Sequence, residues 1–155
     1  MSVENSTGPK PRCLLTGASG YLGGMIARNL VANGCDVVGM TRKPKAGEVT
    51  FKLGDDVAAE RLAGYDALIH CAYDFAPVSW ADIEATNVQG SAKLFRAAKE
   101  AGIKHLLVIS TISAFDGCKS NYGRAKLMIE KHAREAGACV VRPGLIYGAQ
   151  PGAMF

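Results

Sequence analysis

Two patterns in the sequence could do chemistry, and one of them is a tyrosine and a lysine four residues apart. Tyr122 and Lys126 fall in a stretch with helical spacing, residues 121–136, so both side chains are expected on one face of a helix. A nearby ammonium favours the phenolate and would lower the tyrosine pKa from its reference value of about 10. The pair predicts a tyrosine that donates or accepts a proton near neutral pH.

Glycines at intervals of three form the second pattern, between an apolar run at residues 13–16 and a helical pattern that begins at Tyr21. Glycine permits a tight turn and lets a phosphate reach backbone N–H groups, while a helix N-terminus attracts the same anion. The pattern predicts a pyrophosphate site, and an ordinary strand-to-helix turn is the alternative. The cofactor-binding residues expected in this turn are Gly17, Ser19, Gly20, Tyr21, Leu22 and Gly23.

Two cations follow the second apolar run, residues 36–40. In dinucleotide-binding sheets an acidic residue at this point binds the ribose 2′-OH of NAD, whereas arginine accommodates the 2′-phosphate of NADP. Here the run leads into Arg42 and Lys43 with no carboxylate. The charges favour NADP(H) with Arg42 as the phosphate partner, and NAD is the alternative cofactor. The competing interpretation is a solvated basic turn before Pro44.

Short apolar runs alternate with helical patterns along the chain, and these elements must position the residues named above. Strands are expected at residues 13–16, 36–40, 49–53, 65–71, 103–110 and 138–141. Helical patterns begin at residue 21 and occupy residues 58–62, 81–101 and 121–136. This alternation predicts a parallel sheet covered by helices on both faces. We expect residues 1–11 to form a flexible tail and residues 12–155 to form one domain.

The motifs, taken in order, resemble the extended short-chain dehydrogenase/reductase family of the NAD-dependent epimerase/dehydratase type. The residues that carry the resemblance are Thr16-Gly17-Ala18-Ser19-Gly20-Tyr21-Leu22-Gly23, Thr86-Asn87-Val88-Gln89-Gly90, Ser110-Thr111, Tyr122 with Lys126, and Arg142-Pro143-Gly144-Leu145-Ile146-Tyr147-Gly148. The resemblance implies a doubly wound parallel sheet, a Rossmann fold, of about six or seven strands. It also implies hydride transfer between a nicotinamide cofactor and a carbon that bears a carbonyl or hydroxyl group. The implied substrate is a small carbonyl compound or a sugar nucleotide.

The resemblance also assigns roles to individual residues near the reacting carbon. Tyr122 would move the proton, and Lys126 would tune Tyr122 and hold the nicotinamide ribose. Thr111 would orient the substrate oxygen, with Ser113 as the alternative, because this turn departs from the family pattern by about one residue. Asn87 would support the catalytic site through the helix backbone.

Further cofactor contacts are implied by the same resemblance. Asp55 or Asp56 would bind the adenine amino group; the spacing does not choose between them, and either could instead cap the following helix. Ala72 would leave room for the cofactor. Pro143 and Gly144 would place their backbone against the nicotinamide carboxamide.

Composition limits the class of protein. The chain has 155 residues, of which 48% are hydrophobic and 21% charged, which is typical of one globular domain with its own core. The net charge of +4, with no basic run longer than two residues, argues against nucleic acid as a partner. No apolar run suits a secretory signal or a membrane span, so we expect a cytoplasmic protein without a membrane partner. A homodimer is among the expected assemblies.

Five scattered cysteines complete the inventory: Cys13, Cys35, Cys71, Cys118 and Cys139. No cysteine or histidine pair has the spacing of a metal site, so no metal is expected and the thiols are interpreted as reduced core residues. His70 lies within an apolar strand and is interpreted as a core histidine. Tyr73 and Asp74, which follow it, are expected near the substrate.

A second hypothesis is a non-catalytic NADP(H)-binding module with a regulatory or interaction role. It gains support because the sequence reaches Phe155 just after the segment where family members continue into a substrate lobe, which we expect to be missing here. Thr111, Tyr122 and Lys126 together favour the enzyme, because pure binding does not require a tuned phenol.

Overall fold

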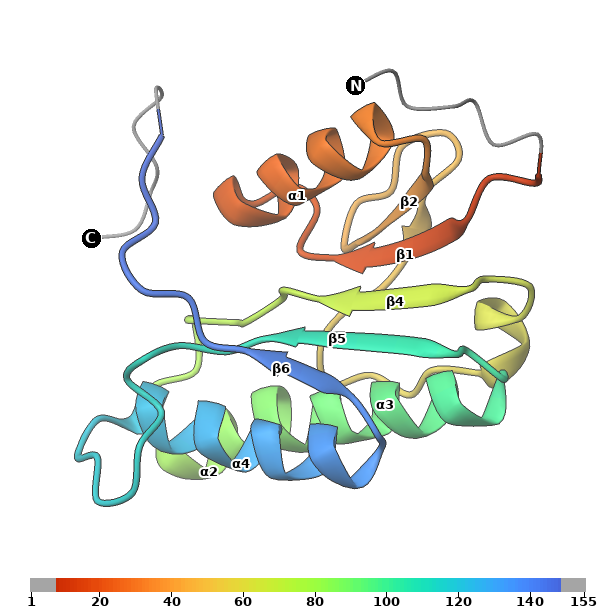
Figure 1. Ribbon diagram of the computed structural model, residues 1–155. Helices are drawn as coiled ribbons and strands as arrows, with labels where there is room; N and C mark the ends of the chain where they lie inside the picture. Colours follow the sequence, from red (N-terminus) through yellow and green to blue (C-terminus); the bar gives the residue numbers. More distant parts are fainter. Residues whose placement is uncertain (1–7, 149–155) are drawn as a thin grey trace.

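The computed structural model describes residues 8–148, which form one sheet of six parallel strands. The strands are β1 (Arg12–Thr16), β2 (Asp36–Thr41), β3 (Val49–Thr50), β4 (Ala67–His70), β5 (His105–Ile109) and β6 (Cys139–Val141). Their order across the sheet is β3-β2-β1-β4-β5-β6, so the chain turns back past β1 before it forms β4 (Figure 1). The predicted doubly wound sheet is confirmed.

Helices lie on both faces of this sheet. They are α1 (Tyr21–Ala32), the 3₁₀ helix η1 (Ala59–Leu62), α2 (Trp80–Ile83), the π-helix η2 (Glu84–Gln89), α3 (Gly90–Glu100) and α4 (Asn121–Glu135). In Figure 1, α1 lies on one side of the sheet and α2, α3 and α4 lie on the other. Within residues 8–148, no helix has both the length and the apolar content needed to cross a membrane.

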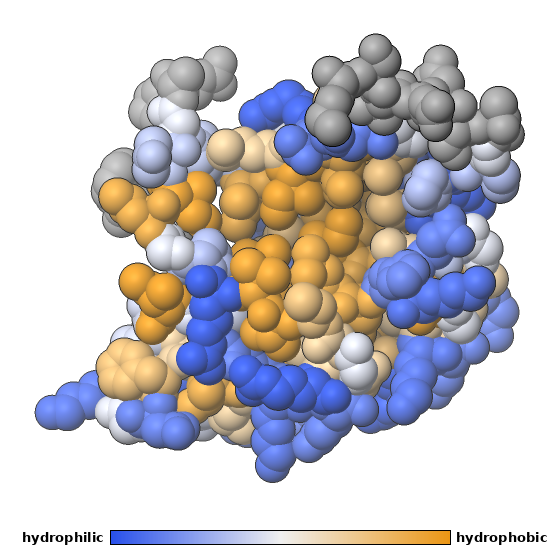
Figure 2. All heavy atoms as spheres, viewed as in Figure 1, coloured by the Kyte–Doolittle hydropathy of each residue, from blue (hydrophilic) through white to orange (hydrophobic). Residues whose placement is uncertain are grey.

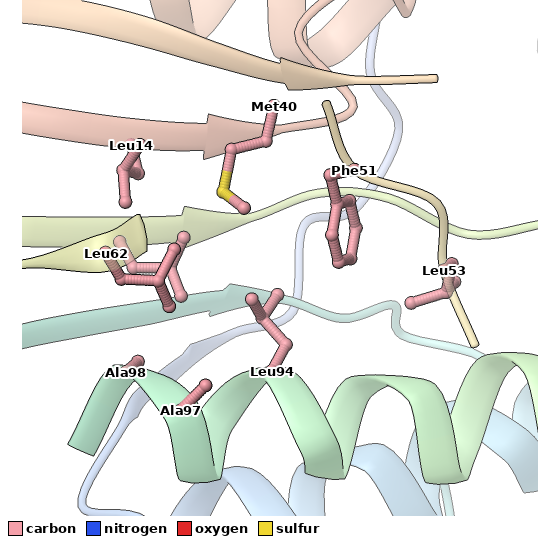
Figure 3. Close-up of a cluster of buried hydrophobic side chains, with 9 residues drawn as sticks. Leu14, Met40, Phe51, Leu53, Leu62, Leu94, Ala97 and Ala98 are labelled. Atoms are coloured by element: carbon pink, nitrogen blue, oxygen red, sulfur yellow. The ribbon is translucent and has the colours of Figure 1, made fainter. Parts of the chain in front are cut away.

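The core explains why the strands have unbroken apolar sequences. Successive side chains of a strand point to opposite faces, and both faces of this sheet are covered. Leu14 and Leu15 of β1 are therefore both fully buried. Leu15 packs in the cluster that includes Ile26 of α1, and Leu14 packs in the cluster that includes Leu94 of α3. Figure 3 shows this second cluster between the sheet and α3.

The third strand is shorter than predicted. Pairing with β2 ends at Thr50, although the apolar pattern extends to Leu53. Phe51 and Leu53 remain in the core, with 6% and 7% of their surface exposed. The apolar pattern therefore marks burial correctly here, whereas strand pairing depends on the neighbouring backbone.

The long helix predicted at residues 81–101 is divided into α2, η2 and α3. The π-helical turn η2 buries Asn87 and Val88 completely. Directly after it, Gly90 lies so close to Gly54 that an added Cβ would overlap the Gly54 nitrogen. The helix ends close to the predicted residue 101, where Gly102 follows the last turn in a left-handed conformation with φ of +77°.

One part of the sheet has an apolar face that the described helices leave open. On the face where α1 packs, Leu107 and Ile109 of β5 are half-buried, Cys139 is exposed and Val141 is 40% exposed. The parallel register places Leu107 beside Cys139 and Ile109 beside Val141. Figure 2 shows apolar side chains gathered over the middle of the molecule in this view.

The cysteines are all free thiols, but the expectation that they lie in the core is met only by Cys13. Cys35, Cys71 and Cys118 are partly exposed, and Cys139 is exposed. The prediction was wrong for Cys139 because, within residues 8–148, no helix covers the face of β6 on which Cys139 lies.

Candidate active site

A cleft of about 420 Å³ lies beyond the carboxyl ends of the strands, around the point where β1 and β4 lead to opposite halves of the sheet. Ligands of open parallel sheets bind in such a crevice. The predicted site residues that line it are Gly17, Ser19, Gly20, Tyr21, Leu22, Gly23, Arg42, Ala72, Thr111, Tyr122, Lys126, Pro143 and Gly144. Asn87, Asp55 and Asp56 do not line the cleft.

The glycine turn forms a compact cradle at the start of α1. Gly17 has a φ of +69°, and the N–H of Gly20 donates to its carbonyl oxygen at 2.9 Å. A Cβ on Gly23 would overlap the same Gly17 carbonyl oxygen, so the turn can close only with glycine there. No side chain caps α1. The cradle and the open helix N-terminus fit a pyrophosphate group.

Arg42 stands at the rim of the cleft, directly after β2. It is exposed, and within residues 8–148 no carboxylate lies within ion-pair distance of its guanidinium group. The hydroxyl of the neighbouring Thr41 instead donates to Glu48 at 3.3 Å. The Arg42 guanidinium is therefore available to an anion that enters the cleft.

Asp55 and Asp56 border a separate small hollow beside β3. Lys93 of α3 lies 2.8 Å from Asp56, and the hydrogen bond from this lysine lowers the Asp56 pKa. The part of the cleft expected beside these aspartates is lined instead by Phe51 and Leu53. Sequence reasoning missed both, although their apolar alternation marked them as inward-facing residues.

Thr111, Tyr122 and Lys126 come together from the end of β5 and the first turns of α4. The N-cap Ser120 begins α4 by accepting from the Gly123 N–H at 3.0 Å, which fixes the turn that carries Tyr122. The Tyr122 and Thr111 side chains both line the cleft and lie close enough for Thr111 to act on the Tyr122 pKa. Ser113 does not line the cleft, and its backbone N–H donates to the Thr111 hydroxyl at 3.2 Å.

The electrostatics of the pair differ from the expectation drawn from spacing. Burial raises the Tyr122 pKa, and the neighbouring Thr111 acts in the opposite direction. The Lys126 ammonium lies 6.0 Å from the Tyr122 ring centroid and donates to the Ile109 carbonyl at 2.9 Å. Burial lowers the pKa of Lys126 to about 8. The expected lowering of the tyrosine pKa does not occur here, because desolvation outweighs the more distant charge.

Three aromatic rings meet beside this group. Tyr73 lies edge-on to Tyr122 with ring centroids 4.9 Å apart, and Phe75 stacks on Tyr122 at 5.6 Å. Burial, followed by the neighbouring Tyr122, raises the Tyr73 pKa to about 12. Tyr73 and Asp74 line the cleft as expected. Phe75 also lines it, although no sequence pattern pointed to this residue.

Asn87 is fully buried behind the cleft. Its amide side chain accepts from the Asp74 N–H at 2.7 Å and donates to the Asp74 carbonyl at 2.9 Å. It therefore holds the backbone of the segment that carries Tyr73, and Asn87 itself does not line the cleft. This contact makes Asn87 a positioning residue.

Glu130 of α4 was not singled out from the sequence. It is fully buried and accepts from Ser110 at 2.6 Å, from Arg142 at 2.7 and 2.6 Å, and from Arg134 at 2.8 Å. Burial alone would raise the Glu130 pKa, but these hydrogen bonds lower it. A spacing of four after Lys126 is the signal that could have identified it. The network holds the chain just before Pro143 against α4.

Comparisons with known proteins agree with this geometry. The sequence model of the NAD dependent epimerase/dehydratase family matches residues 13–155. The chain is 32% identical over 111 residues to 4-hydroxy-2-methyl-3-oxo-4-farnesyl-3,4-dihydroquinoline-1-oxide ketoreductase of Stigmatella aurantiaca, covering 64% of this chain and 33% of that protein. It is 31% identical over 115 residues to dTDP-4-dehydrorhamnose reductase of Mycobacterium tuberculosis, covering 71% of this chain and 36% of that protein.

A solved structure also has a fold similar to that of the chain. The Bordetella bronchiseptica enzyme WbmG in complex with NAD is 26% identical, with a TM-score of 0.68, and the match covers 88% of this chain and 53% of that one. The chain thus spans about a third of the length of the two curated relatives and about half of this structure. The residues that the family model matches, 13–155, include all the residues that line the cleft and almost the whole sheet.

Proposed function

Because the chain belongs to the NAD-dependent epimerase/dehydratase family, we propose that it is an NAD(P)-dependent oxidoreductase or epimerase/dehydratase that acts at a carbonyl or hydroxyl carbon. The observation that carries the proposal is the cleft, in which the glycine turn faces the same space as Thr111, Tyr122 and Lys126. A glycine turn alone supports only nucleotide binding. A phenol beside a threonine hydroxyl in the same cleft adds a means of proton transfer.

Each residue of the group has a separate task in this proposal. The nicotinamide cofactor supplies hydride transfer when it is bound. Thr111 orients the substrate oxygen, Tyr122 moves the proton at that oxygen, and Lys126 holds the nicotinamide ribose. The raised pKa keeps the Tyr122 phenol protonated at neutral pH, so the phenol can donate a proton to a carbonyl oxygen.

NADP(H) is the proposed cofactor, with NAD as the alternative. The exposed guanidinium of Arg42 at the rim of the cleft supports the choice, because it offers a planar, permanently charged partner to a 2′-phosphate. The WbmG structure contains NAD, so both cofactors belong in the first experiment. The proposed substrates are small carbonyl compounds and sugar nucleotides, in keeping with the names of the two reductases above.

Turnover of a panel of carbonyl compounds and sugar nucleotides, followed by NAD(P)H absorbance, tests the proposal. We expect Tyr122→Phe to lower kcat by about 100-fold or more while cofactor binding stays unchanged. Tyr65→Phe is the matched control, because Tyr65 packs on Arg12 away from the cleft. If the chain binds cofactor and Tyr122→Phe is as active as the parent, the catalytic assignment fails. Binding with no turnover of any substrate class would instead favour the non-catalytic module.

A further inference from the structure

Behind the cleft, three buried polar side chains join elements that are far apart in the sequence. Thr16 ends β1, His70 ends β4 and Ser91 lies in the first turn of α3. Their exposed fractions are 0%, 1% and 0%, and none of the three lines the cleft. The proposed reaction has no task for them. Buried polar groups are costly unless they are hydrogen-bonded, so their partners identify what they hold in place.

The direction of the hydrogen bonds at Thr16 is fixed by its partners. The Thr16 hydroxyl oxygen accepts from the backbone N–H of Cys71 at 3.1 Å and of Ala72 at 3.2 Å. Two lone pairs are then in use, so the hydroxyl hydrogen is donated to His70 Nδ1, 2.8 Å away. His70 must therefore be unprotonated at Nδ1.

The hydrogen bonds on the Nε2 side of the His70 ring lead independently to the same tautomer. The Ser91 hydroxyl lies 2.6 Å from the Asn87 carbonyl oxygen, which can only accept, so Ser91 donates there. Ser91 must then accept from His70 Nε2–H at 2.9 Å. His70 is thus the neutral Nε2–H tautomer. Burial, followed by the charge of Lys126, lowers its pKa to about 3, so this state persists at neutral pH.

The chain of bonds ends on backbone that lines the cleft. Thr16 holds residues 71–72 directly against the glycine turn, where a Cβ on Gly17 would be only 3.1 Å from the Ala72 nitrogen. At the other end, Ser91 donates to the carbonyl of Asn87 in the π-helical turn, and the Asn87 side chain makes two hydrogen bonds with the backbone of Asp74. π-helical turns are often found at functional sites. The glycine turn and residues 71–74 are therefore supported by one hydrogen-bonded unit.

We propose that Thr16, His70 and Ser91 form a positioning chain that fixes the glycine turn and residues 71–74 in the geometry that binds the dinucleotide. This inference rests on the proposed cofactor site. The chain needs a hydroxyl at Thr16 that both accepts and donates, and a ring at His70 that accepts at one end and donates at the other. Loss of either function frees the two walls of the cleft to move relative to each other.

Cofactor dissociation constants, measured by fluorescence titration of the full chain with NADPH and with NADH, test this chain. We expect Thr16→Val to raise the dissociation constant of the more tightly bound cofactor about tenfold, and we expect Thr16→Ser to bind as the parent does. Ser91→Ala is expected to weaken binding in the same direction. The Thr16→Val, Ser91→Ala double variant should lose less than the sum of the two single losses, because both act through His70.

Two measurements separate positioning from general destabilisation. All variants are titrated where circular dichroism shows them folded. Ile129→Val, a core change at a residue that takes no part in these hydrogen bonds, serves as the control that should leave the dissociation constants unchanged. Nitrogen-15 NMR of His70 should show the Nε2–H tautomer at every pH from about 5 to about 8. Unchanged dissociation constants for Thr16→Val and Ser91→Ala would overturn the positioning chain alone. No binding of either cofactor to the parent would overturn the proposed function as well.

Discussion

Lys126 combines a charge with nearly complete burial. Only 4% of the residue is exposed, and its ammonium donates to the Ile109 carbonyl. Desolvation lowers the Lys126 pKa from 10.5 to about 8, which means that the charge costs folding free energy at neutral pH. The role proposed for Lys126 at the cofactor would explain why the chain carries this cost in stability.

Replacement of this lysine should therefore stabilise the protein. We expect Lys126→Met to raise the free energy of unfolding at pH 7 by about 1 kcal/mol, after allowance for the lost hydrogen bond to Ile109. Between pH 8 and 10.5 the unfolded parent binds more protons than the folded one, so its stability rises with pH, and the variant should lack this rise. Urea denaturation at pH 7 and pH 10 measures both effects. A less stable variant at pH 7 would contradict the prediction.

Arg42 offers a second test on a single side chain. Arg42→Ala, which removes the guanidinium, should weaken NADPH binding about tenfold and leave NADH binding almost unchanged, because only NADPH carries the 2′-phosphate. Lys43→Ala is the matched control, since the neighbouring cation does not line the cleft. Titration of both cofactors measures the preference. Equal affinities of the parent for NADH and NADPH would remove the basis for the NADP proposal.

Helix α4 organises the catalytic side of the cleft. Tyr122, Lys126 and Glu130 follow one another at intervals of four and so share one helical face. Tyr122 and Lys126 line the cleft, whereas Glu130 binds Ser110 after β5 and Arg142 after β6. One helix face thus connects the proposed catalytic groups to the ends of two strands.

Glu130→Gln should loosen this connection. The amide presents an NH₂ group to the arginine and serine donors, so we expect a loss of about 2 kcal/mol in unfolding free energy and weaker cofactor binding through the segment at Pro143. The folded pKa of Glu130 is lowered below 4.5, so its contribution is present above that pH and is lost as pH falls through the folded pKa. Thermal melts at pH 7 and pH 4 should show a smaller acid-induced loss in the variant.

Glu135→Gln provides the control on the same helix. Its carboxylate is 59% exposed. Among the described residues, the ion pair that it forms is with His132, at 3.4 Å. Exposed pairs of this kind contribute little to stability. A Glu130→Gln variant that melts together with the Glu135→Gln control at pH 7 would show that the buried network has no stabilising role.

One part of a sheet face is apolar and uncovered by the described helices. Cys139 and Val141 of β6, with Leu107 and Ile109 of β5, continue the surface on which α1 packs. The chain spans about half of the WbmG structure that it matches, so a further segment of a longer protein suits this face as well as a second copy of the chain does. The homodimer expected from the sequence stays a prediction.

Self-association through this face can be measured directly. We expect sedimentation velocity of the 155-residue chain to show a concentration-dependent dimer, and Val141→Lys to shift it toward monomer. Val31→Lys is the control, because Val31 is 58% exposed on α1. A parent chain that stays monomeric at every concentration tested would contradict the prediction.

Much of the cleft follows from local sequence signals. The glycine turn, the helix stop at Gly102 and the spacing of Tyr122 and Lys126 depend on neighbours within a few residues, so the sequence reveals them. The family resemblance drawn from the order of the motifs is confirmed. The assigned roles of the individual site residues remain predictions, although most of these residues do line one cleft.

The sequence alone determined the alternation of strands and helices, the doubly wound sheet and the residue types at its carboxyl edge, because periodicity and turn chemistry are local properties. Only the tertiary structure decided that Tyr122 has a raised pKa, that Asp56 pairs with Lys93, and that Asn87 clasps Asp74. These outcomes depend on burial and on contacts between distant segments. Spacing along one helix could place an ammonium near a phenol, but it could not weigh that charge against the loss of water around the ring.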